Sequence, residues 1–304
     1  MTLDISLSRT RNVALPIERT NVTLYRKGVC MGNEIALRPS YWASVSGGKD
    51  SLFMLNLILH NLDKYPLDGV VHFELDIDYP FITNVIDYMQ QECESHGIRF
   101  VRIKPRKCWT EWFDTINSKT GNIYGFPTRK ARWCNDKYKL DARRQLDEFM
   151  ATQGFYVVYY IGYCTDEENR FAKRVDLQKV ERYPLVEENI SEDVIWEWAK
   201  TQQIFNHYYE TNKRCGCMYC PMSSYLNFAY LYKYYPKHFA YMIRKMRETE
   251  ELRERELGRP FSVISSNPKY NSVYLDRIIK TKWLKILNDK VKETKVRRNN
   301  GNEI

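Results

Sequence analysis

The sequence predicts an α/β fold with a parallel, Rossmann-like sheet, followed by a helical region that contains several cysteines. Two observations support this prediction. Short apolar stretches of strand character alternate with amphipathic stretches of helical period, and this order favours parallel strands joined by right-handed crossovers. Past residue 186, the apolar residues follow a helical period only. We therefore expect an N-terminal extension (1–40), an α/β domain (41–186) and a helical region with a basic tail (187–304).

The first 40 residues are polar, with apolar runs only at 13–15 and 22–25, where we expect an edge strand or a short hairpin. Cys30 is expected to be a lone thiol. Charges throughout residues 1–19 exclude the apolar core of a signal peptide, and no window holds the roughly 18 apolar residues that span a bilayer. Eight cysteines in such a chain are typical of intracellular thiols or metal ligands, so we expect a cytoplasmic protein.

A glycine-rich turn separates the first predicted strand, Tyr41–Val45, from the first predicted helix, Leu52–Leu62. The turn consists of Ser46, Gly47, Gly48, Lys49, Asp50 and Ser51. A strand, a glycine-rich turn and a helix N-terminus direct backbone N–H groups at an anion, and the lysine and the serines add a charge and hydroxyl donors. The turn is therefore predicted to bind nucleotide phosphates, although it has neither the Walker spacing nor G-x-G-x-x-G.

Acidic residues follow the second predicted strand, 69–75, which precedes a predicted helix over 81–96 and a third strand over 98–103. Ligands of a parallel sheet bind beyond the C-terminal ends of its strands. Asp76 and Asp78 are predicted to lie at that edge, where Asp76 would bind a ribose hydroxyl or a metal. A solvated turn explains the same two residues equally well.

A basic segment, 125–134, follows a predicted helix over 109–116 and precedes another over 136–150. It contains Arg129, Lys130 and Arg132 next to Cys134. Three cations beside a thiol would form an anion site and would lower the pKa of that thiol. The alternative is a solvated basic loop.

Polar residues also follow the fourth predicted strand, 154–162, among them Asp166, Glu167 and Arg170. Residues 183–186 are expected to close the α/β domain. Within 188–203 we expect a helix that Ser191 caps.

The densest cysteine spacing is C-x-C-x-x-C, formed by Cys215, Cys217 and Cys220, with a proline after the last cysteine. Three thiolates within six residues can hold one metal centre, and both an iron–sulfur cluster of the 4Fe–4S type and zinc fit such donors. Unligated thiols are the alternative. Cys134 is our first choice for a fourth ligand; Cys164 and His207 are weaker choices.

The remaining sequence predicts helices over 227–254 and 269–290. The net charge of +9, much of it from the basic tail 280–298, favours anionic partners such as nucleotides, sulfonucleotides and nucleic acid, and solubility is the alternative explanation. We expect most of the 23 tyrosines to pack in half-buried positions and a minority to be available for stacking on bases.

Five motifs in fixed order resemble the phosphoadenosine phosphosulfate reductase family of PP-loop, N-type ATP pyrophosphatases, and in particular its subgroup from phages and mobile elements. They are S-G-G-K-D-S (46–51), R-x-x-R-W-C (129–134), D-E-x-x-R (166–170), Y-P-L-V-E (183–187) and C-x-x-C-P (217–221). The resemblance covers 41–248 and implies an adenine nucleotide alpha hydrolase-like fold. It also implies that Gly47, Gly48 and Asp50 hold phosphates, that Arg129 and Arg132 face the substrate, that Asp166, Glu167 and Arg170 form a polar group, and that Cys217 and Cys220 bind a cluster.

No cysteine follows Cys220 in the sequence, whereas sulfonucleotide reductases carry a nucleophilic cysteine near the C-terminus. The departure favours an ATP pyrophosphatase that adenylates an acceptor for sulfur transfer, with Lys49 on the β/γ phosphates, Mg²⁺ near Asp50, and Arg129 or Arg132 stabilising the developing charge. One alternative is a reductase that releases sulfite from a sulfonucleotide and uses Cys134 or Cys215. Another is a non-enzymatic nucleotide- or nucleic-acid-binding module with a structural metal. Expected partners are an adenine nucleotide, a nucleic-acid acceptor, a sulfur-donor protein and a second copy of the chain.

Overall fold

The computed structural model describes residues 37–167, 180–205 and 208–301, with side chains described through residue 294. The hairpin expected within residues 13–25, Cys30, Arg170 and His207 lie outside the described residues. The described part contains a parallel sheet of five strands in the order β3-β2-β1-β4-β5, which confirms the α/β class. The strands are β1 (Arg38–Val45), β2 (Gly69–Phe73), β3 (Phe100–Ile103), β4 (Phe155–Tyr160) and β5 (Glu181–Arg182).

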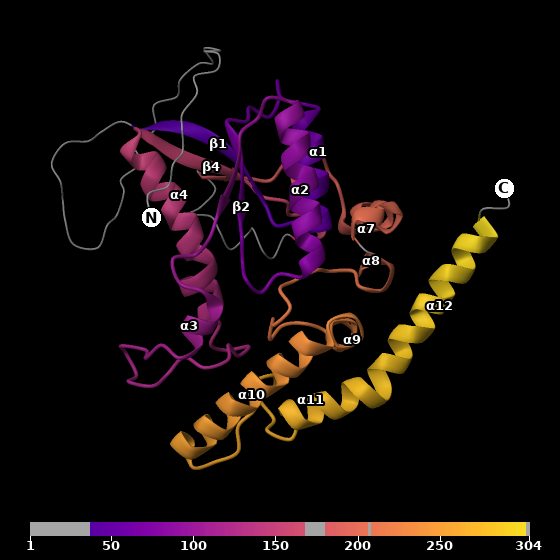
Figure 1. Cartoon of the computed structure of the whole chain (residues 1–304). Coiled ribbons are helices and arrows are strands. Elements are labelled where there is room, and N and C mark those ends of the chain that lie inside the picture. The colour runs from indigo at the N-terminus through magenta and orange to yellow at the C-terminus, as the bar shows by residue number, and fades with distance from the viewer. Residues whose placement is uncertain (1–36, 168–179, 206–207, 302–304) are drawn as a thin grey trace.

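Helices cover both faces of this sheet (Figure 1). Helices α1 (Lys49–Leu59) and α2 (Pro80–Ser95) pack on one face, and α4 (Leu140–Thr152) packs on the other. Side chains of a strand alternate between the two faces: Ala43 and Val45 belong to the core beneath α1 and α2, whereas Trp42 belongs to the core beneath α4. The central strand β1 is therefore buried on both sides, as its apolar sequence predicts.

Three element boundaries differ from the prediction. Strand β1 starts at Arg38, inside the predicted N-terminal extension, because it pairs with β4 from Arg38 opposite Phe155 onwards. Helix α1 starts at Lys49 and not at residue 52, so the second half of the glycine-rich turn forms the first turn of the helix. The helix expected over 136–150 begins with a π-helical segment, Cys134–Lys139, before α4.

Short helices connect the sheet to the helical region. They are α3 (Trp109–Phe113), α6 (Pro184–Glu187), α7 (Glu192–Thr201) and α8 (Tyr208–Thr211). The Ser191 side chain accepts a hydrogen bond from Val194 N, which confirms the predicted cap of α7.

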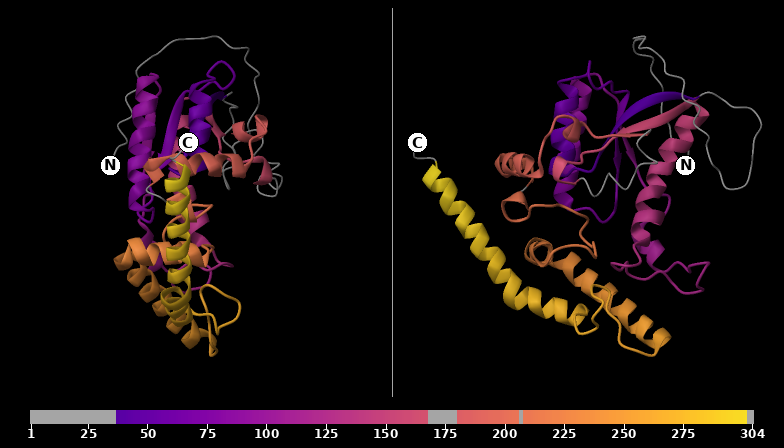
Figure 2. Two further views of the ribbon diagram at one scale, coloured as in Figure 1. Left: turned by 90° about the vertical axis from the view of Figure 1, so that its right-hand side faces the viewer. Right: turned by 180° about the vertical axis from the view of Figure 1, so that it is seen from behind.

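The helical region consists of α9 (Tyr225–Tyr234), α10 (Pro236–Leu257), α11 (Ser272–Ile278), a π-helical segment (Ile279–Trp283) and α12 (Leu284–Gly301). Pro236 separates α9 from α10 because proline is accepted in the first turn of a helix but not in its interior. Figure 2 shows α12 leaving the other helices, with its C-terminal end apart from the sheet. Within the described ranges, no helix combines the length and apolar character needed to cross a bilayer.

Several hydrogen bonds tie the helical region to the sheet domain. Met218 N donates to Ile77 O, just past β2, at 2.8 Å. Phe126 N donates to Thr249 Oγ1 of α10 at 2.8 Å. The segments around Cys217 and Arg129 are thereby fixed near the C-terminal edge of the sheet, where parallel sheets bind ligands.

Candidate functional site

The glycine-rich turn, called here the phosphate loop (Ser46–Ser51), is a tight turn between β1 and α1. Ser46 N donates to Ser51 Oγ at 3.2 Å, and Ser51 Oγ donates to Gly48 O at 2.9 Å. Gly47 has a φ of +72°, and a Cβ at this position would lie 2.6 Å from Ile82 Cγ2 of α2. Only glycine satisfies both conditions without strain. The loop is therefore a preformed turn at a helix N-terminus, as predicted.

Gly162, just past β4, lies against the same loop. A Cβ on Gly162 would lie 3.0 Å from Asp50 O and 3.2 Å from Ser51 N. The sequence interpretation gave this glycine no role. Its signal was its position at the end of a strand, where glycine often marks close approach of another backbone.

Lys49 is buried in a network of charges. Its side chain is 1% exposed, and Nζ lies 2.5 Å from Asp50 Oδ1 and 3.5 Å from Glu192 Oε1. Arg214 donates to both oxygens of Glu192, at 2.9 and 2.8 Å, and approaches Glu167 Oε1 at 3.5 Å. The ammonium group of Lys49, which we predicted to contact phosphates, is therefore held by carboxylates in this structure. Glu192 and Arg214 also belong to this site, and the sequence analysis did not predict them.

Asp50 also contacts the thiol of Cys164. Burial raises the pKa of Asp50, and the adjacent Lys49 opposes this rise. Cys164 Sγ donates to Asp50 Oδ1 at 3.6 Å, and burial raises the pKa of this thiol as well. Cys164, a weaker candidate for a metal ligand, therefore lies beside the phosphate loop.

Tyr209 of α8 connects the phosphate loop to Cys215. Lys49 N donates to Tyr209 OH at 2.9 Å. The same hydroxyl lies beside the Cys215 thiol, whose pKa burial raises to about 12, and the hydroxyl of Tyr208 donates to Arg214 O at 3.3 Å. The negative charges of Asp78 and Asp50 act on Cys215 in the same direction. Tyr209 thus accepts the N–H of Lys49 at the N-terminus of α1 and lies next to Cys215, one of the three clustered cysteines.

The acidic residues predicted at the sheet edge are held by protein groups. Asp76 accepts hydrogen bonds from the hydroxyl of Tyr138 and from Trp109 N, the latter at 3.2 Å, so it fixes the start of α3. Asp166 Oδ2 accepts from Glu192 N at 3.1 Å, at the first residue of α7. Contact of Asp76, Asp166 or Glu167 with a nucleotide remains a prediction.

The cysteine loop, defined as Arg214–Pro221, places Cys217 and Cys220 together. Cys220 N donates to Cys217 O at 3.2 Å, and the neighbouring Cys217 thiol lowers the pKa of Cys220 below its ordinary value of 9.0. Lys139 lies next to this pair, and negative charge at Cys217, followed by Asp78 and the other neighbouring thiols, raises the pKa of its ammonium group.

Cys134 belongs to the same group of thiols. It interacts electrostatically with Cys220, and burial raises its pKa, which Lys139 and Arg132 oppose. Cys134 therefore lies near Cys220 and Lys139, and its role as a metal ligand remains a prediction. Cys215 is directed instead to the tyrosines of α8, so the structure does not bring all four predicted ligands together.

The two predicted catalytic arginines lie beside the cysteine loop. Arg129 Nε donates to Pro221 O at 3.3 Å, and the charge of Arg132 acts on both Cys134 and Cys220. Both arginine side chains are exposed. They are therefore placed to meet an anionic substrate that approaches the cysteines.

Soft thiol donors of this kind suit zinc or an iron–sulfur cluster. Among the described residues, however, no three Cys, His, Asp or Glu side chains converge as a metal coordination sphere. The Cys134, Cys217 and Cys220 thiols fit such a group by their chemistry; to bind it, their sulfur atoms would have to converge on one point, which they do not do in the described structure.

Comparison with known proteins gives distant relatives. No family model matches the chain. Two uncharacterized proteins of Methanocaldococcus jannaschii are similar: MJ0066 is 26% identical over 193 residues, and MJ0973 is 23% identical over 240 residues. These alignments cover 58% and 73% of this chain, but only 35% and 51% of the two relatives. The chain thus spans about half or less of the length of these relatives.

One solved structure, the U34-tRNA thiolase NcsA from Methanococcus maripaludis with its 4Fe–4S cluster, aligns with 80% of this chain and 72% of that chain. The identity is 17% and the TM-score is 0.33. A likeness of this size is too low to assign a family or an activity.

Proposed function

We propose that this chain is a PP-loop adenine-nucleotide enzyme that adenylates an acceptor for sulfur transfer, in a phosphorothioation- or thiolation-like reaction. The observation that carries the proposal is the preformed phosphate loop at the C-terminal edge of a parallel sheet, joined through Tyr209 to the cysteine loop. The order of the five sequence motifs supports the same reaction class.

The phosphate loop would bind the β and γ phosphates of ATP. The N-terminus of α1 and the backbone of Gly47 and Gly48 supply the groups that favour an anion at this position. Lys49 lies between Asp50 and Glu192, so its charge is balanced before nucleotide binds. Mg²⁺ bound with the nucleotide would neutralise phosphate charge, and Asp50 is the carboxylate that would contact it.

The acceptor would approach from the side of the cysteine loop. Arg129 and Arg132 are exposed there and would stabilise charge that develops as the α-phosphate is attacked. A 4Fe–4S cluster, with zinc as the alternative, would be held by Cys134, Cys217 and Cys220 and would supply sulfur or electron chemistry. The thiol of Cys164 would remain with Asp50.

Reduction of a sulfonucleotide is supported less well. That reaction needs a thiolate at Cys134 or Cys215, because the thiolate is the nucleophile. Burial raises the pKa of both thiols, that of Cys215 to about 12. Burial therefore disfavours the thiolate form at both residues.

Pyrophosphate release from ATP in the presence of candidate RNA and DNA acceptors tests the proposal. The decisive variant is Asp50→Asn, which keeps the size of the side chain, with Asp87→Asn on the exposed side of α2 as its matched control. We expect Asp50→Asn to abolish release and Asp87→Asn to leave it unchanged. Equal activity of the two variants would show that the loop does not act on ATP.

Metal analysis and a visible spectrum of anaerobically purified protein test the cysteine assignment separately. Cys217→Ser should lose the bound metal, whereas Cys108→Ser should retain it. Cys108 is a matched control because it lies at the N-cap of α3, where serine also caps.

A further inference from the structure

The segment from Ser272 to Gly301, which forms α11 and α12, carries most of the excess charge of the chain. It contains nine Lys and Arg residues against three Asp and Glu residues, a net charge of +6 out of +9 for the whole sequence. Among its described side chains, the ion pair is between Lys280 and Asp276, at 2.8 Å. Three of the nine cations, at positions 295, 297 and 298, lie outside the described side chains; of the six described ones, Lys280 has a carboxylate partner within ion-pair distance among the described residues.

Three exposed cations of this segment form a line along the helices, whereas the exposed Lys280, Lys282 and Lys290 lie off this line. The exposed Asp289 lies on the same face, four residues after Lys285 and three before Lys292. Arg277, Lys285 and Lys292 are exposed and are spaced by about two helical turns each. The buried residues Ile279 and Leu287 mark the other side, which packs against α9 and α8. Lys233 of α9 donates to Asn288 at 2.8 Å and fixes α12 in this position. We call the line of Arg277, Lys285 and Lys292 the basic ridge.

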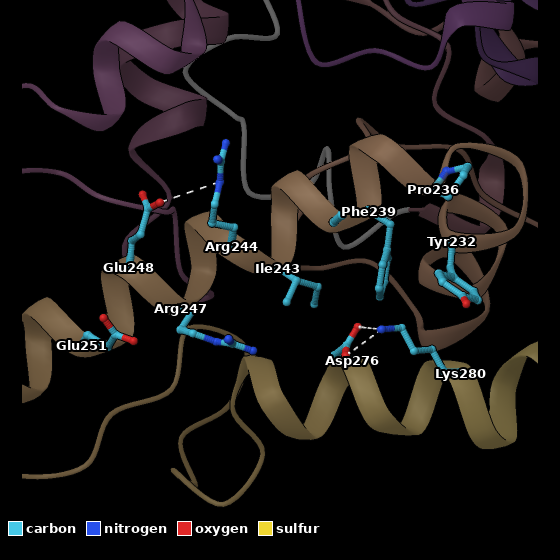
Figure 3. Close-up of a pocket in the computed structure, with 11 residues that line it drawn as sticks. Tyr232, Pro236, Phe239, Ile243, Arg244, Arg247, Glu248, Glu251, Asp276 and Lys280 are labelled. Atoms are coloured by element: carbon cyan, nitrogen blue, oxygen red, sulfur yellow. Dashed lines mark hydrogen bonds and ion pairs between the residues drawn. The ribbon is translucent and has the colours of Figure 1, made fainter.

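The nearby groove between α10 and α11 differs from the ridge (Figure 3). It encloses about 340 Å³ above the apolar side chains Phe239 and Ile243. Its three cations are matched by three acids, and two of the pairs, Arg244 with Glu248 and Lys280 with Asp276, are ion pairs. Because the positive and negative charges of this groove balance, it does not attract a polyanion. The excess positive charge lies instead on the outer side of α11 and α12.

We infer that the basic ridge binds the phosphate backbone of a nucleic acid. Regularly spaced cations on one helix face neutralise successive phosphates and release counterions. A membrane surface fits less well, because an interfacial helix inserts its apolar face and here that face is buried against α8 and α9. This inference rests on the proposed function in one respect: the nucleic acid is taken to be the acceptor.

The position of the ridge suits that role. Helix α12 packs against α8. Helix α8 carries Tyr209, whose hydroxyl accepts a hydrogen bond from Lys49 N of the phosphate loop. Figure 1 shows α12 running from the helical region past α8 and α7. A nucleic acid held along the basic ridge therefore lies on the outer side of α12, one helix away from α8 and the candidate site.

Fluorescence anisotropy of the full chain over a salt series tests the ridge, with labelled probes of an RNA hairpin, oligouridine and a DNA duplex. The test variant is Arg277→Gln/Lys285→Gln/Lys292→Gln. Its control removes three exposed cations of the sheet domain: Lys64→Gln/Lys104→Gln/Lys119→Gln. We expect the ridge variant to bind roughly tenfold more weakly or worse and to lower the salt slope by about 2 to 3, with the control near wild type. The three probes decide which form of nucleic acid is preferred.

Equal loss in the two triple variants, no binding by the wild type to any probe at low salt, or a preference for phosphatidylserine vesicles would overturn the inference. All six positions are exposed, so thermal unfolding followed by circular dichroism should be unchanged. Pyrophosphate release from ATP in the presence of the nucleic-acid probe that binds best separates the two proposals. If ridge-dependent binding occurs without any ATP chemistry, the ridge stands and the proposed function fails.

Discussion

Gly47→Ala tests whether the close approach of the phosphate loop to α2 determines the site. Gly47 has a φ of +72°, and its added Cβ would lie 2.6 Å from Ile82 Cγ2. The left-handed backbone conformation costs an L-residue roughly 1–2 kcal/mol. Crowding in a packed core adds about 1–3 kcal/mol. We therefore expect Gly47→Ala to lower the free energy of unfolding by about 2–5 kcal/mol.

Gly97→Ala separates the two costs. Gly97 has a nearly equal φ of +67°, but a Cβ there would meet nothing within 4 Å. It should therefore lose only the conformational part, and the difference between the two variants should be about 1–3 kcal/mol. Ile82→Ala removes the clashing methyl group, so a double-mutant cycle with Gly47→Ala should show a favourable coupling energy of similar size.

Urea unfolding measures these stabilities, and calorimetric titration with ATP measures the consequence for binding. Relief of the clash would displace the loop backbone, and small displacements of positioned groups cost roughly 10- to 100-fold. We expect that loss of ATP affinity for Gly47→Ala and wild-type affinity for Gly97→Ala. Equal stability and equal ATP affinity of the two variants would refute the argument that contact with Ile82 fixes the loop.

The charges and hydrogen bonds around Lys49 give two further predictions. Tyr209→Phe should lower the free energy of unfolding by about 1–3 kcal/mol in urea, because Lys49 N–H is left buried without its acceptor; an unchanged urea midpoint would show that water replaces the hydroxyl. Glu192→Gln should lower stability at neutral pH. Although burial acts the other way, the hydrogen bond from Arg214 and the charge of Lys49 lower the pKa of Glu192 below its ordinary value of 4.5. Its contribution is therefore fully present above pH 4.5 and is lost as the pH falls through the lowered pKa, so wild type and variant should converge in acid. A stability difference that persists below that pH would contradict this assignment.

The order of strands and helices and the phosphate loop were predictable because they depend on local patterns. The period of the apolar residues, the positions of the glycines and the cap at Ser191 can each be recognised within a short stretch of sequence. The environment of Lys49 was not predictable in this way. Its partners Tyr209 and Glu192 come from α8 and α7, more than 140 residues further along the chain. A lysine in a glycine-rich turn predicts a cation that is free to bind an anion. In this fold, tertiary packing buries Lys49 and places it beside the carboxylates of Asp50 and Glu192.

The cysteines show the same limit, because their spacing in the sequence does not predict their neighbours in the fold. The C-x-C-x-x-C spacing predicts that Cys215 lies with Cys217 and Cys220, but in the fold Cys215 lies apart from these two cysteines. Cys217 and Cys220 meet Cys134 around Lys139, whereas Cys215 meets Tyr208 and Tyr209. The hydroxyl of Tyr209 also accepts the N–H of Lys49. An anion at the helix N-terminus would compete with Tyr209 for that N–H group, because both are acceptors at the same donor. We therefore expect that an anion in the phosphate loop would displace Tyr209, whose hydroxyl also lies beside Cys215, and that the two halves of the candidate site would respond together.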